Sequence, residues 1–409
     1  MCAATLVGIL VRPWRIGEWI WALGGALALV TFGLLPAGVA LRAVAGGSDV
    51  YLFLAGMMLL AETARSQGVF DWLAAHAVAL ARGSSWRLYT IVFGLGAIVT
   101  AVLSNDATAV VLTPAVAAVT RKARVDPLPH LFACAMVANA ASFVLPIANP
   151  ANLVIFSGDL PPLGAWLRAF ALPSVASIVV TFATLAFAER SRLRGAAAPG
   201  SDCSALTRGG RTALAGIGVA AAGLIAASAF GTPLGLPTAV LGASVLAAVS
   251  VSDRTAPRTA AEGVSWTVLL LVAGLFVLVA AVDRSGMLTM VRSAAEHLAL
   301  ASPLVSGLTA AFAITAASNL ANNLPVAVLA GQATSSLHHA GTFVNAVTIG
   351  IDLGPNLSVT GSLATVLWLV ALRREGIAIG SLHFLRVGAF VTPPALAAAI
   401  VALVASAPR

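Results

Sequence analysis

Two short polar stretches interrupt long apolar runs, and their residue types could bind a solute. The first contains Ser104, Asn105 and Asp106, with apolar sequence on both sides. The second contains Asn322 and Asn323, far along the chain in a similar setting. A carboxyl group placed in hydrocarbon costs roughly 2.5–3.5 kcal/mol on insertion scales. Polar groups retained at such a cost predict the two facing tips of a transport site.

Two further stretches combine proline with polar residues. Pro146–Asn152 and Asp352–Ser358 each interrupt an apolar helical pattern that resumes afterwards. Proline removes a backbone donor and breaks the helical hydrogen-bond ladder. The freed carbonyl groups and the asparagine side chains are then able to bind a substrate.

Of the fifteen acidic residues, Asp106 and Asp352 alone lie inside polar breaks at clear membrane depth. A carboxyl group there can take up and release a proton during a transport cycle, which makes both residues candidates for proton coupling. The alternative is that each carboxylate caps a half-helix by accepting backbone N–H bonds. We prefer proton coupling for Asp106. For Asp352 both interpretations stay open, because Gly354 and Pro355 follow it as at a helix restart.

Amide and hydroxyl side chains are the candidates for substrate binding. An amide both donates and accepts hydrogen bonds, which suits a small polyhydroxy solute as well as an ion. Any single one could instead join two membrane helices, but their occurrence together favours binding. The candidates are Asn105, Asn149, Asn152, Asn322, Asn323, Asn356, Ser358 and Thr360.

The composition predicts an integral membrane protein. The chain has 409 residues, of which 59% are hydrophobic and 9% charged, whereas a soluble domain carries about 25% charged residues. Recurrent apolar runs of about 18 residues favour helices over a barrel, and so an all-α fold. The formal net charge of +8 does not indicate a nucleic-acid partner, because the arginines lie in short loops between apolar runs.

Signatures of enzymes and of metal sites are absent from the sequence. There is no GxxxxGK[ST] loop, HExxH or GxSxG motif, and Lys122 is the only lysine. Cys2, Cys134 and Cys203 are widely separated and form no CxxC pair, so neither a disulfide scaffold nor a zinc site is predicted. We therefore expect a protein that is not an enzyme and that binds no cofactor or metal.

Apolar periodicity predicts the same order of elements in two halves. Each half has a span, an amphipathic helix of the kind that lies at a membrane interface, a hairpin with a polar tip, and a broken helix. The hairpin arms are short for full spans, which favours re-entrant hairpins. In the first half these elements are Val50–Ala64, Val69–Ala81, Leu88–Val119 and Leu131–Phe156; in the second they are Trp266–Val282, Met287–Leu300, Leu304–Leu337 and Phe343–Ala371.

This order predicts about ten transmembrane helices in two repeats. Residues 1–189 form the N-terminal membrane half, with the first repeat at about 50–189. Residues 190–211 form a polar cytoplasmic linker, and residues 212–409 form the C-terminal half, with the second repeat at about 264–409. In proteins built this way, the substrate site lies near the midplane where the broken helices meet. The N-terminal run Leu6–Val11 could form a short helix that spans only half of the membrane.

The distribution of basic residues predicts that the repeats are inverted. Cytoplasmic loops collect Arg and Lys. Six basic residues surround the first hairpin and two the second: Arg65, Arg82, Arg87, Arg121, Lys122 and Arg124 against Arg284 and Arg292. We therefore expect residues 121–124 and the linker to face the cytoplasm and Ala333–Thr342 to face outside. The alternative is a tandem duplication kept for packing alone.

Several motifs together resemble one known family. They are Ser104–Ala107 with Leu112–Pro114, Asn322–Pro325, and most specifically Asp352–Asn356 with Thr360–Trp368. Over nearly the whole chain they resemble the arsenite/antimonite efflux permease family of the ion transporter superfamily. The resemblance implies a multi-pass protein of the cell inner membrane that exports arsenite or antimonite as the neutral trihydroxide, driven by inward proton movement. In some organisms a soluble ATPase subunit assists. One departure is Asn356, where the family carries a basic residue.

Two other functions stay open. One is a carrier of an anion such as a dicarboxylate, or a sodium/proton antiporter, with the same fold. A dicarboxylate carrier should show positive charge or paired Ser-Asn-Thr tips at the site, whereas this sequence has carboxylates there and no deep Lys or Arg. The other is a membrane subunit without transport activity of its own, which would explain the composition but not the polar breaks.

Overall fold

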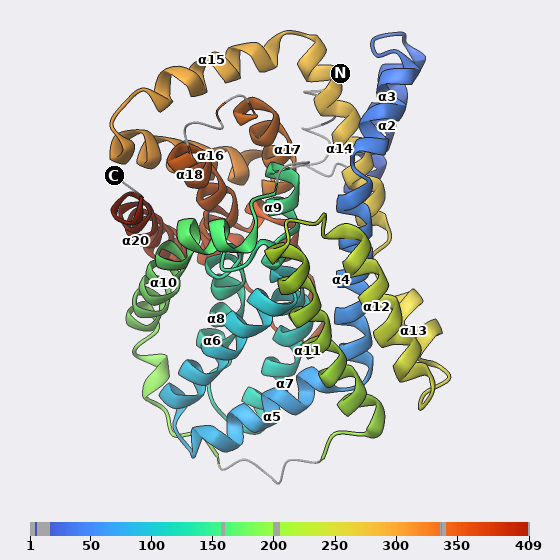
Figure 1. Cartoon of the computed structure of the whole chain (residues 1–409). Helices are drawn as coiled ribbons and strands as arrows, with labels where there is room; N and C mark the ends of the chain where they lie inside the picture. The colour runs from blue at the N-terminus through green and yellow to red at the C-terminus, as the bar shows by residue number, and fades with distance from the viewer. Residues whose placement is uncertain are drawn as a thin grey trace.

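The computed structural model is built almost entirely of helices (Figure 1). It describes residue 5 and residues 17–156, 160–198, 205–335, 337 and 341–407, so the short helix predicted at Leu6–Val11 lies outside the described residues. Within these ranges no β-strand forms, and the one β-type pairing is an isolated bridge between Ser84 and Ala196. The all-α membrane fold predicted from composition is confirmed.

In the first half, the first two described helices form a hairpin, and the second and third helices form a bent pair. Helix α5 begins and ends at the residues that the apolar periodicity predicts. The π-helix η2 and α7 form the second arm of the first hairpin. The elements are α2 (Glu18–Thr31), α3 (Ala37–Gly46), α4 (Ser48–Ser66), α5 (Val69–Ala81), α6 (Ser85–Val102), η2 (Ala107–Leu112), α7 (Thr113–Lys122), α8 (Leu128–Ala140), η3 (Pro146–Ala148), α9 (Pro150–Ile155), α10 (Leu163–Ala188) and η4 (Arg192–Arg194).

The second half begins with three further helices and then follows the predicted order. Its broken helix is interrupted by two short 3₁₀ turns, η5 and η6, at the glycine and proline after Asp352. The elements are α11 (Arg208–Ala229), α12 (Gly235–Ser250), α13 (Ala256–Gly263), α14 (Thr267–Arg284), α15 (Met287–Ala299), α16 (Pro303–Ala321), α17 (Asn323–Thr334), α18 (Gly341–Leu353), η5 (Gly354–Leu357), η6 (Val359–Gly361), α19 (Leu363–Arg374) and α20 (Ser381–Ser406).

Six helices of the described chain are each long and apolar enough to cross a membrane: α6, α10, α11, α14, α16 and α20. The pair α3 and α4, bent by 46°, raises the number to seven if it counts as one span. The total of about ten spans therefore stays a prediction. The first arms of the two hairpins, α6 with 18 residues and α16 with 19, are longer than the sequence pattern indicated. Each is long enough to span, so re-entry of the hairpins also stays a prediction.

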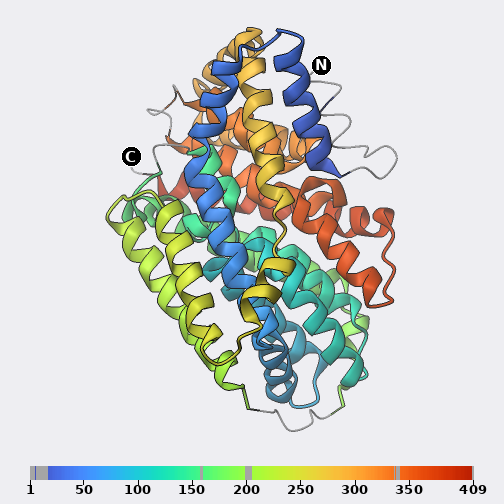
Figure 2. The same ribbon diagram turned by 90° about the vertical axis from the view of Figure 1, so that its right-hand side faces the viewer.

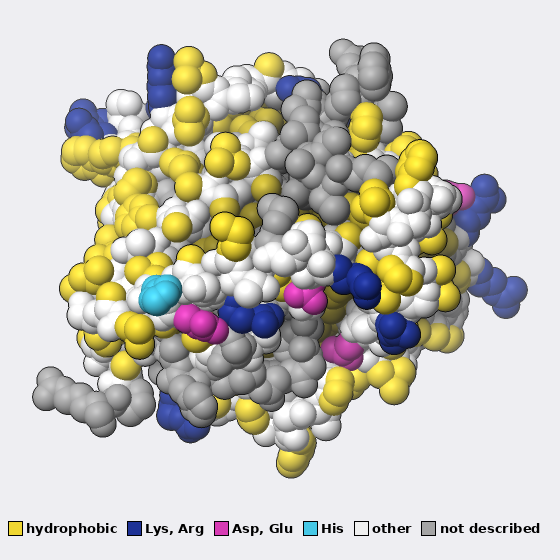
Figure 3. Space-filling view, turned by 90° about the horizontal axis from the view of Figure 1, so that it is seen from above, with side chains coloured by type: hydrophobic (Ala, Val, Ile, Leu, Met, Phe, Trp, Pro, Cys, Tyr) yellow, Lys and Arg dark blue, Asp and Glu magenta, His cyan; other side chains and the backbone are white. Residues whose placement is uncertain are grey.

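The two amphipathic helices lie at opposite ends of the molecule. Helix α5 lies at one end and α15 at the other. Helix α4 leads from the middle of the molecule to the α5 end, and α14 leads from the middle to the α15 end (Figures 1 and 2). Viewed from the α15 end, charged side chains are scattered among apolar ones (Figure 3). Opposite placement of matching elements is what an inverted repeat requires, although the repeat itself stays a prediction.

The loops predicted to be cytoplasmic meet at the α5 end. Ala198 N donates to Ala123 O across 2.7 Å, and Arg192 pairs with Asp126 at 3.0 Å. The guanidinium group of Arg121 binds both the carboxylate and the backbone carbonyl of Glu375. These contacts join the loop after α7, the linker and the end of α19 on one side of the molecule, and their placement in the cytoplasm stays a prediction.

Helix α8 forms the centre of the fold. Every residue from Pro129 to Ala140 is buried, which identifies a helix that is covered on all sides rather than one at a surface. It packs against α6, α10 and α7 of its own half and against η5 of the other half. The C-terminal helices of the halves, α10 and α20, pack along each other outside it.

Candidate functional site

The tip of the first hairpin is held by its own polar side chains. Ser104 Oγ accepts a hydrogen bond from Ala107 N at 3.2 Å, and Asn105 Oδ1 accepts one from Asp106 N at 2.9 Å. Both side chains are buried. The chain then enters the π-helix η2, a rare form that is frequent at functional sites. Asn105 therefore shapes the tip by binding its backbone.

Asp106 has a different environment from its neighbours. Its side chain caps no helix, so the structure does not support the alternative interpretation of Asp106 as a capping residue. It lines a half-open cavity of about 100 Å³ together with Glu62 of α4, Pro150 of α9 and Leu363 of α19. No hydrogen bond to the Asp106 carboxyl group forms within the described ranges. Its carboxyl group is therefore free to meet a solute or a proton in the cavity.

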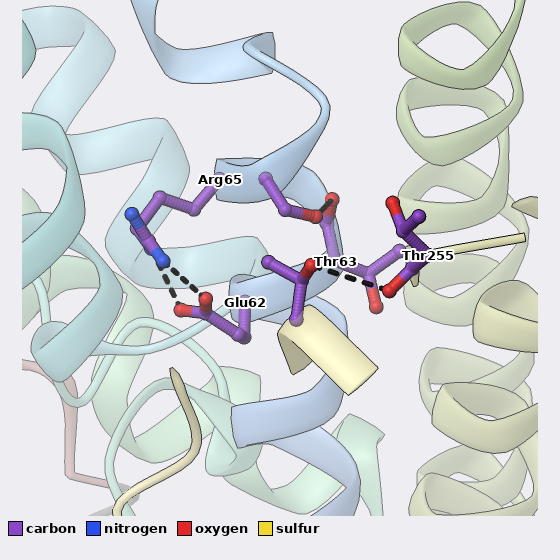
Figure 4. Close-up of polar contacts among 6 residues, drawn as sticks. Glu62, Thr63, Arg65 and Thr255 are labelled. Carbon is purple, nitrogen blue, oxygen red and sulfur yellow. Dashed lines mark hydrogen bonds and ion pairs between the residues drawn. The ribbon is translucent and has the colours of Figure 1, made fainter. Parts of the chain in front are cut away.

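Glu62 is the second carboxyl group at this cavity. It is buried, with 7% of its surface exposed, and it binds Arg65 of the same helix through two hydrogen bonds, one from Nε at 2.7 Å (Figure 4). A Cβ atom added at Gly263 would lie 2.0 Å from Glu62 Oε1, so the glycine leaves room for this carboxylate. The sequence places Glu62 near the end of a span but does not indicate that it shares a cavity with Asp106.

The tip of the second hairpin is built around Asn322. Its φ of 66° is in the left-handed region, where few residues other than glycine are found. Its Oδ1 accepts a hydrogen bond from Leu324 N at 3.3 Å and so caps α17. Asn323, the first residue of α17, is 6% exposed. The amide of Asn322 is thus used to stabilise the tip, as that of Asn105 is in the first hairpin.

Each hairpin packs against the broken helix of the opposite half. Helix α17 of the second hairpin contacts α9, and η2 of the first hairpin contacts α19. The approach is closest at Gly331, where an added Cβ would lie 2.7 Å from Ile155 O. Each hairpin is therefore in direct contact with the broken helix of the other half.

The two broken helices cross at a buried polar cluster. Asn149 Nδ2 donates to Asp352 Oδ1 at 2.7 Å, while Asn149 Oδ1 accepts from Ala151 N at 3.0 Å and caps α9. Asn152 Nδ2 donates to Ser142 O at 3.0 Å. Asp352 and Asn152 are fully buried. Asp352 thus binds a side chain from the other half, so the structure favours the cross-half contact over a helix cap.

A second chain of amides joins the halves nearby. Asn356 Nδ2 donates to Met136 O at 2.8 Å, and Asn356 Oδ1 accepts from Asn139 Nδ2 at 3.0 Å. Both polar atoms of Asn356 are therefore bound within the protein. Asn139 lies near the end of a largely apolar helix, and the sequence offers no pattern that would have identified it.

Ser358 and Thr360 bind the end of α16. Ser358 Oγ donates to Asn319 Oδ1 at 2.6 Å, and Thr360 Oγ1 donates to Asn319 O at 2.8 Å. Asn319 Nδ2 donates to Gly354 O at 3.0 Å. Thr360 is exposed, whereas Ser358 is partly buried. Asn319 was not among the predicted site residues, although its position in the polar stretch before Asn322 was a usable signal.

The predicted site residues therefore fall into four places. Asp106 and Asn105 lie at the first tip, and Asn322 and Asn323 at the second. The broken-helix crossing holds Asn149, Asn152, Asp352 and Asn356. Ser358 and Thr360 lie beside Asn319.

Comparison with known proteins agrees with a membrane transporter. The family model for citrate transporters matches residues 6–351. The arsenical pump membrane protein of Escherichia coli strain K12 is 26% identical over 421 residues, covering 98% of this chain and 96% of that protein. An uncharacterised transporter of Mycobacterium tuberculosis is also 26% identical, covering 97% and 95%. These relatives confirm the resemblance that the motifs predict.

The fold is also similar to that of a solved transporter. The crystal structure of the YdaH transporter of Alcanivorax borkumensis superimposes with a TM-score of 0.60 at 15% sequence identity. The match covers 90% of this chain and 86% of that one. At this identity the likeness concerns the fold.

Proposed function

This chain belongs to the citrate transporter family, and within that family we propose that it exports arsenite or antimonite from the cytoplasm across the cell inner membrane. The solute would cross as the neutral trihydroxide, and inward proton movement through Asp106 would drive it. The near full-length likeness to an arsenical pump membrane protein supports this substrate.

One observation carries the proposal. No Arg or Lys is buried in the part of the chain that the structure describes, while amides, hydroxyls and the carboxyl groups of Glu62 and Asp352 are buried. A buried anion needs a positive partner or several donors, because an unpaired charge in a low dielectric is costly. A neutral solute that hydrogen bonds needs no positive partner, so these surroundings suit a trihydroxide better than a tricarboxylate.

The predicted site residues would then have different roles in transport. Asn323 at one tip and Asp106 at the other would meet the solute. Asn322 uses its Oδ1 to cap α17 and would offer its Nδ2 to the solute. Asn105, Asn149 and Asn356 bind protein groups with their amides and would hold the tips and broken helices in position. Asn152, Ser358 and Thr360 would complete the polar surroundings. Alternating access would come from movement of one bundle against the other.

Arsenite accumulation in cells that lack their own efflux system tests the proposal. Cells with the protein should accumulate less arsenite than cells with the empty vector, and cells with Asp106→Asn should resemble the vector control. Equal accumulation in all three strains would reject arsenite export.

The family match itself favours a second candidate, transport of citrate. Uptake of labelled citrate in the same strains separates the two. Citrate uptake without any change in arsenite accumulation would replace the first proposal with the second.

A further inference from the structure

The crossing of the two broken helices has more hydrogen-bond acceptors than donors. Three buried side-chain oxygens there have no hydrogen-bond partner within the described residues: Asn139 Oδ1, Asn152 Oδ1 and Asp352 Oδ2. Asn139 is 1% exposed and the other two side chains are fully buried. A buried acceptor without a partner costs about 1–3 kcal/mol and calls for an explanation.

The orientation of each amide, oxygen against nitrogen, is fixed by backbone carbonyl oxygens, which can only accept hydrogen bonds. Met136 O only accepts, so Asn356 must donate with Nδ2 and accept with Oδ1, and Asn139 must then donate with its own Nδ2. The Asn139 oxygen is therefore left over. The same argument applies to Asn152, whose Nδ2 faces the carbonyl oxygens of Ser142 and Pro146 at 3.0 and 3.4 Å. Flipping either amide would place two acceptors together and cannot remove the surplus.

Asp352 adds a third acceptor. Its Oδ1 takes the hydrogen bond from Asn149, and Asn149 Oδ1 is itself occupied by Ala151 N. The side chains of Ser142 and Asn152 lie beside the same carboxyl group. Ser142 Oγ already donates to Asn139 O at 2.8 Å. The Ser142 and Asn152 side chains lie within reach of the carboxyl group, but no hydrogen bond to Asp352 Oδ2 forms within the described residues.

Helix ends reinforce the surplus of negative potential. Asn139 lies at the C-terminal end of α8 and Asp352 at the C-terminal end of α18. The C-terminal end of a helix carries a partial negative charge of about half a unit from its unpaired carbonyls. The N-terminal end of α9 also reaches the crossing, but Asn149 caps it.

We propose that this crossing binds a small monovalent metal cation, with Na⁺ as the probe. Asp352 Oδ2 and Asn152 Oδ1 would be ligands, and Asn139 Oδ1 would lie at the edge of the same site. Oxygen-only ligands suit hard cations. One carboxylate balances one positive charge, whereas a divalent ion would leave an uncompensated buried charge. The ion would join the broken helices of the two halves.

The site does not depend on what is transported. It makes Asp352 a metal ligand, which separates its role from the proton carrier proposed at Asp106. A proton on Asp352 Oδ2 is the rival occupant. It would turn that oxygen into a donor for one of the two acceptors that remain, Asn139 Oδ1 and Asn152 Oδ1. The two occupants differ in what stabilises the protein, Na⁺ or low pH.

Thermal unfolding of the purified protein in detergent tests the site without any arsenite. Midpoints are measured in NaCl, KCl and choline chloride at equal ionic strength and pH. We expect a midpoint that rises with the logarithm of the Na⁺ concentration above its Kd, as binding to the folded state requires, and smaller or no shifts in the other salts. Asp352→Asn, which keeps the size of the side chain, should lose the Na⁺ shift. Asp71→Asn, at an exposed acid on α5, is the matched control and should keep it.

Three outcomes would overturn the inference. The first is a wild-type midpoint that is equal in all three salts, a result that stands even if Asp352→Asn does not fold. The second is an Na⁺ shift that survives in Asp352→Asn. The third is a midpoint that follows pH and not Na⁺, which would identify the proton as the occupant. No substrate is present in this experiment, so a negative result would leave the export proposal intact. Conversely, a measured Na⁺ shift would stand even if the protein exported no arsenite.

Discussion

The Asn149 amide donates to the Asp352 carboxylate across 2.7 Å, although 203 residues separate them in the sequence. One belongs to the broken helix of the first half and the other to that of the second. Asn149 also caps α9 through Ala151 N. A single side chain therefore fixes both the restart of one broken helix and its contact with the other.

Asn149→Ala should remove both interactions. The cap is worth about 0.5–2 kcal/mol, and an interhelical hydrogen bond in a membrane averages about 0.6 kcal/mol. We expect a protein that still inserts but unfolds at lower temperature and loses arsenite efflux. Asn149→Ser keeps a capping oxygen and should recover most of the stability, but it cannot reach Asp352 in the same way, so its efflux should stay low. Normal efflux by Asn149→Ser would show that the contact with Asp352 has no role in transport.

A second prediction concerns the tip residue Asn322, whose φ is 66°. At this φ, variants can separate the effect of backbone strain from the effect of losing the amide. Alanine there is strained by about 1–3 kcal/mol, whereas glycine accepts the conformation without strain. Asn322→Gly should therefore be expressed and fold better than Asn322→Ala. If the amide meets the solute, both variants lose efflux to a similar degree. If efflux is instead higher in the more stable variant, Asn322→Gly, than in Asn322→Ala, then Asn322 has a structural role only.

The sequence predicts the helices well because their signals are local. Apolar periodicity locates α5 at Val69–Ala81 and α15 within one residue of its end. Proline and glycine mark the breaks after α8 and α18, since each disrupts the ladder within its own turn.

Contacts across the halves are not encoded in such local patterns. Asn139 lies in a largely apolar helix, and nothing nearby in the sequence indicates that its partner is Asn356. Glu62 likewise meets the Asp106 cavity only because α4 passes the first hairpin in three dimensions. The candidates Asn105 and Asn356 were chosen for amide chemistry, but whether an amide is free or bound to a neighbouring backbone group depends on packing.

The pair of Arg121 and Glu375 leads to a prediction of membrane orientation. Arg121 at the end of α7 binds Glu375 at the end of α19, so the two residues lie on one side. In a variant without Cys2, Cys134 and Cys203, cysteines at either position should react with a membrane-impermeant thiol reagent only from the cytoplasm. A cysteine at Thr342 should react only from outside. Labelling of Arg121→Cys and Thr342→Cys from the same side would reject the inverted repeat.

Asp106 is the carboxyl group that we expect to carry the proton. It lies at a hairpin tip, caps no helix and lines the cavity that α4, α9 and α19 share with the first hairpin. Asp106→Asn keeps the size of the side chain and cannot exchange a proton. In everted membrane vesicles it should still bind arsenite but lose the uptake that a pH gradient drives, while Asp71→Asn at the exposed face of α5 should behave like the wild type. If Asp106→Asn retains gradient-driven uptake and Asp352→Asn loses it, Asp106 is not the proton carrier. If both retain it, neither carboxyl group couples protons to transport.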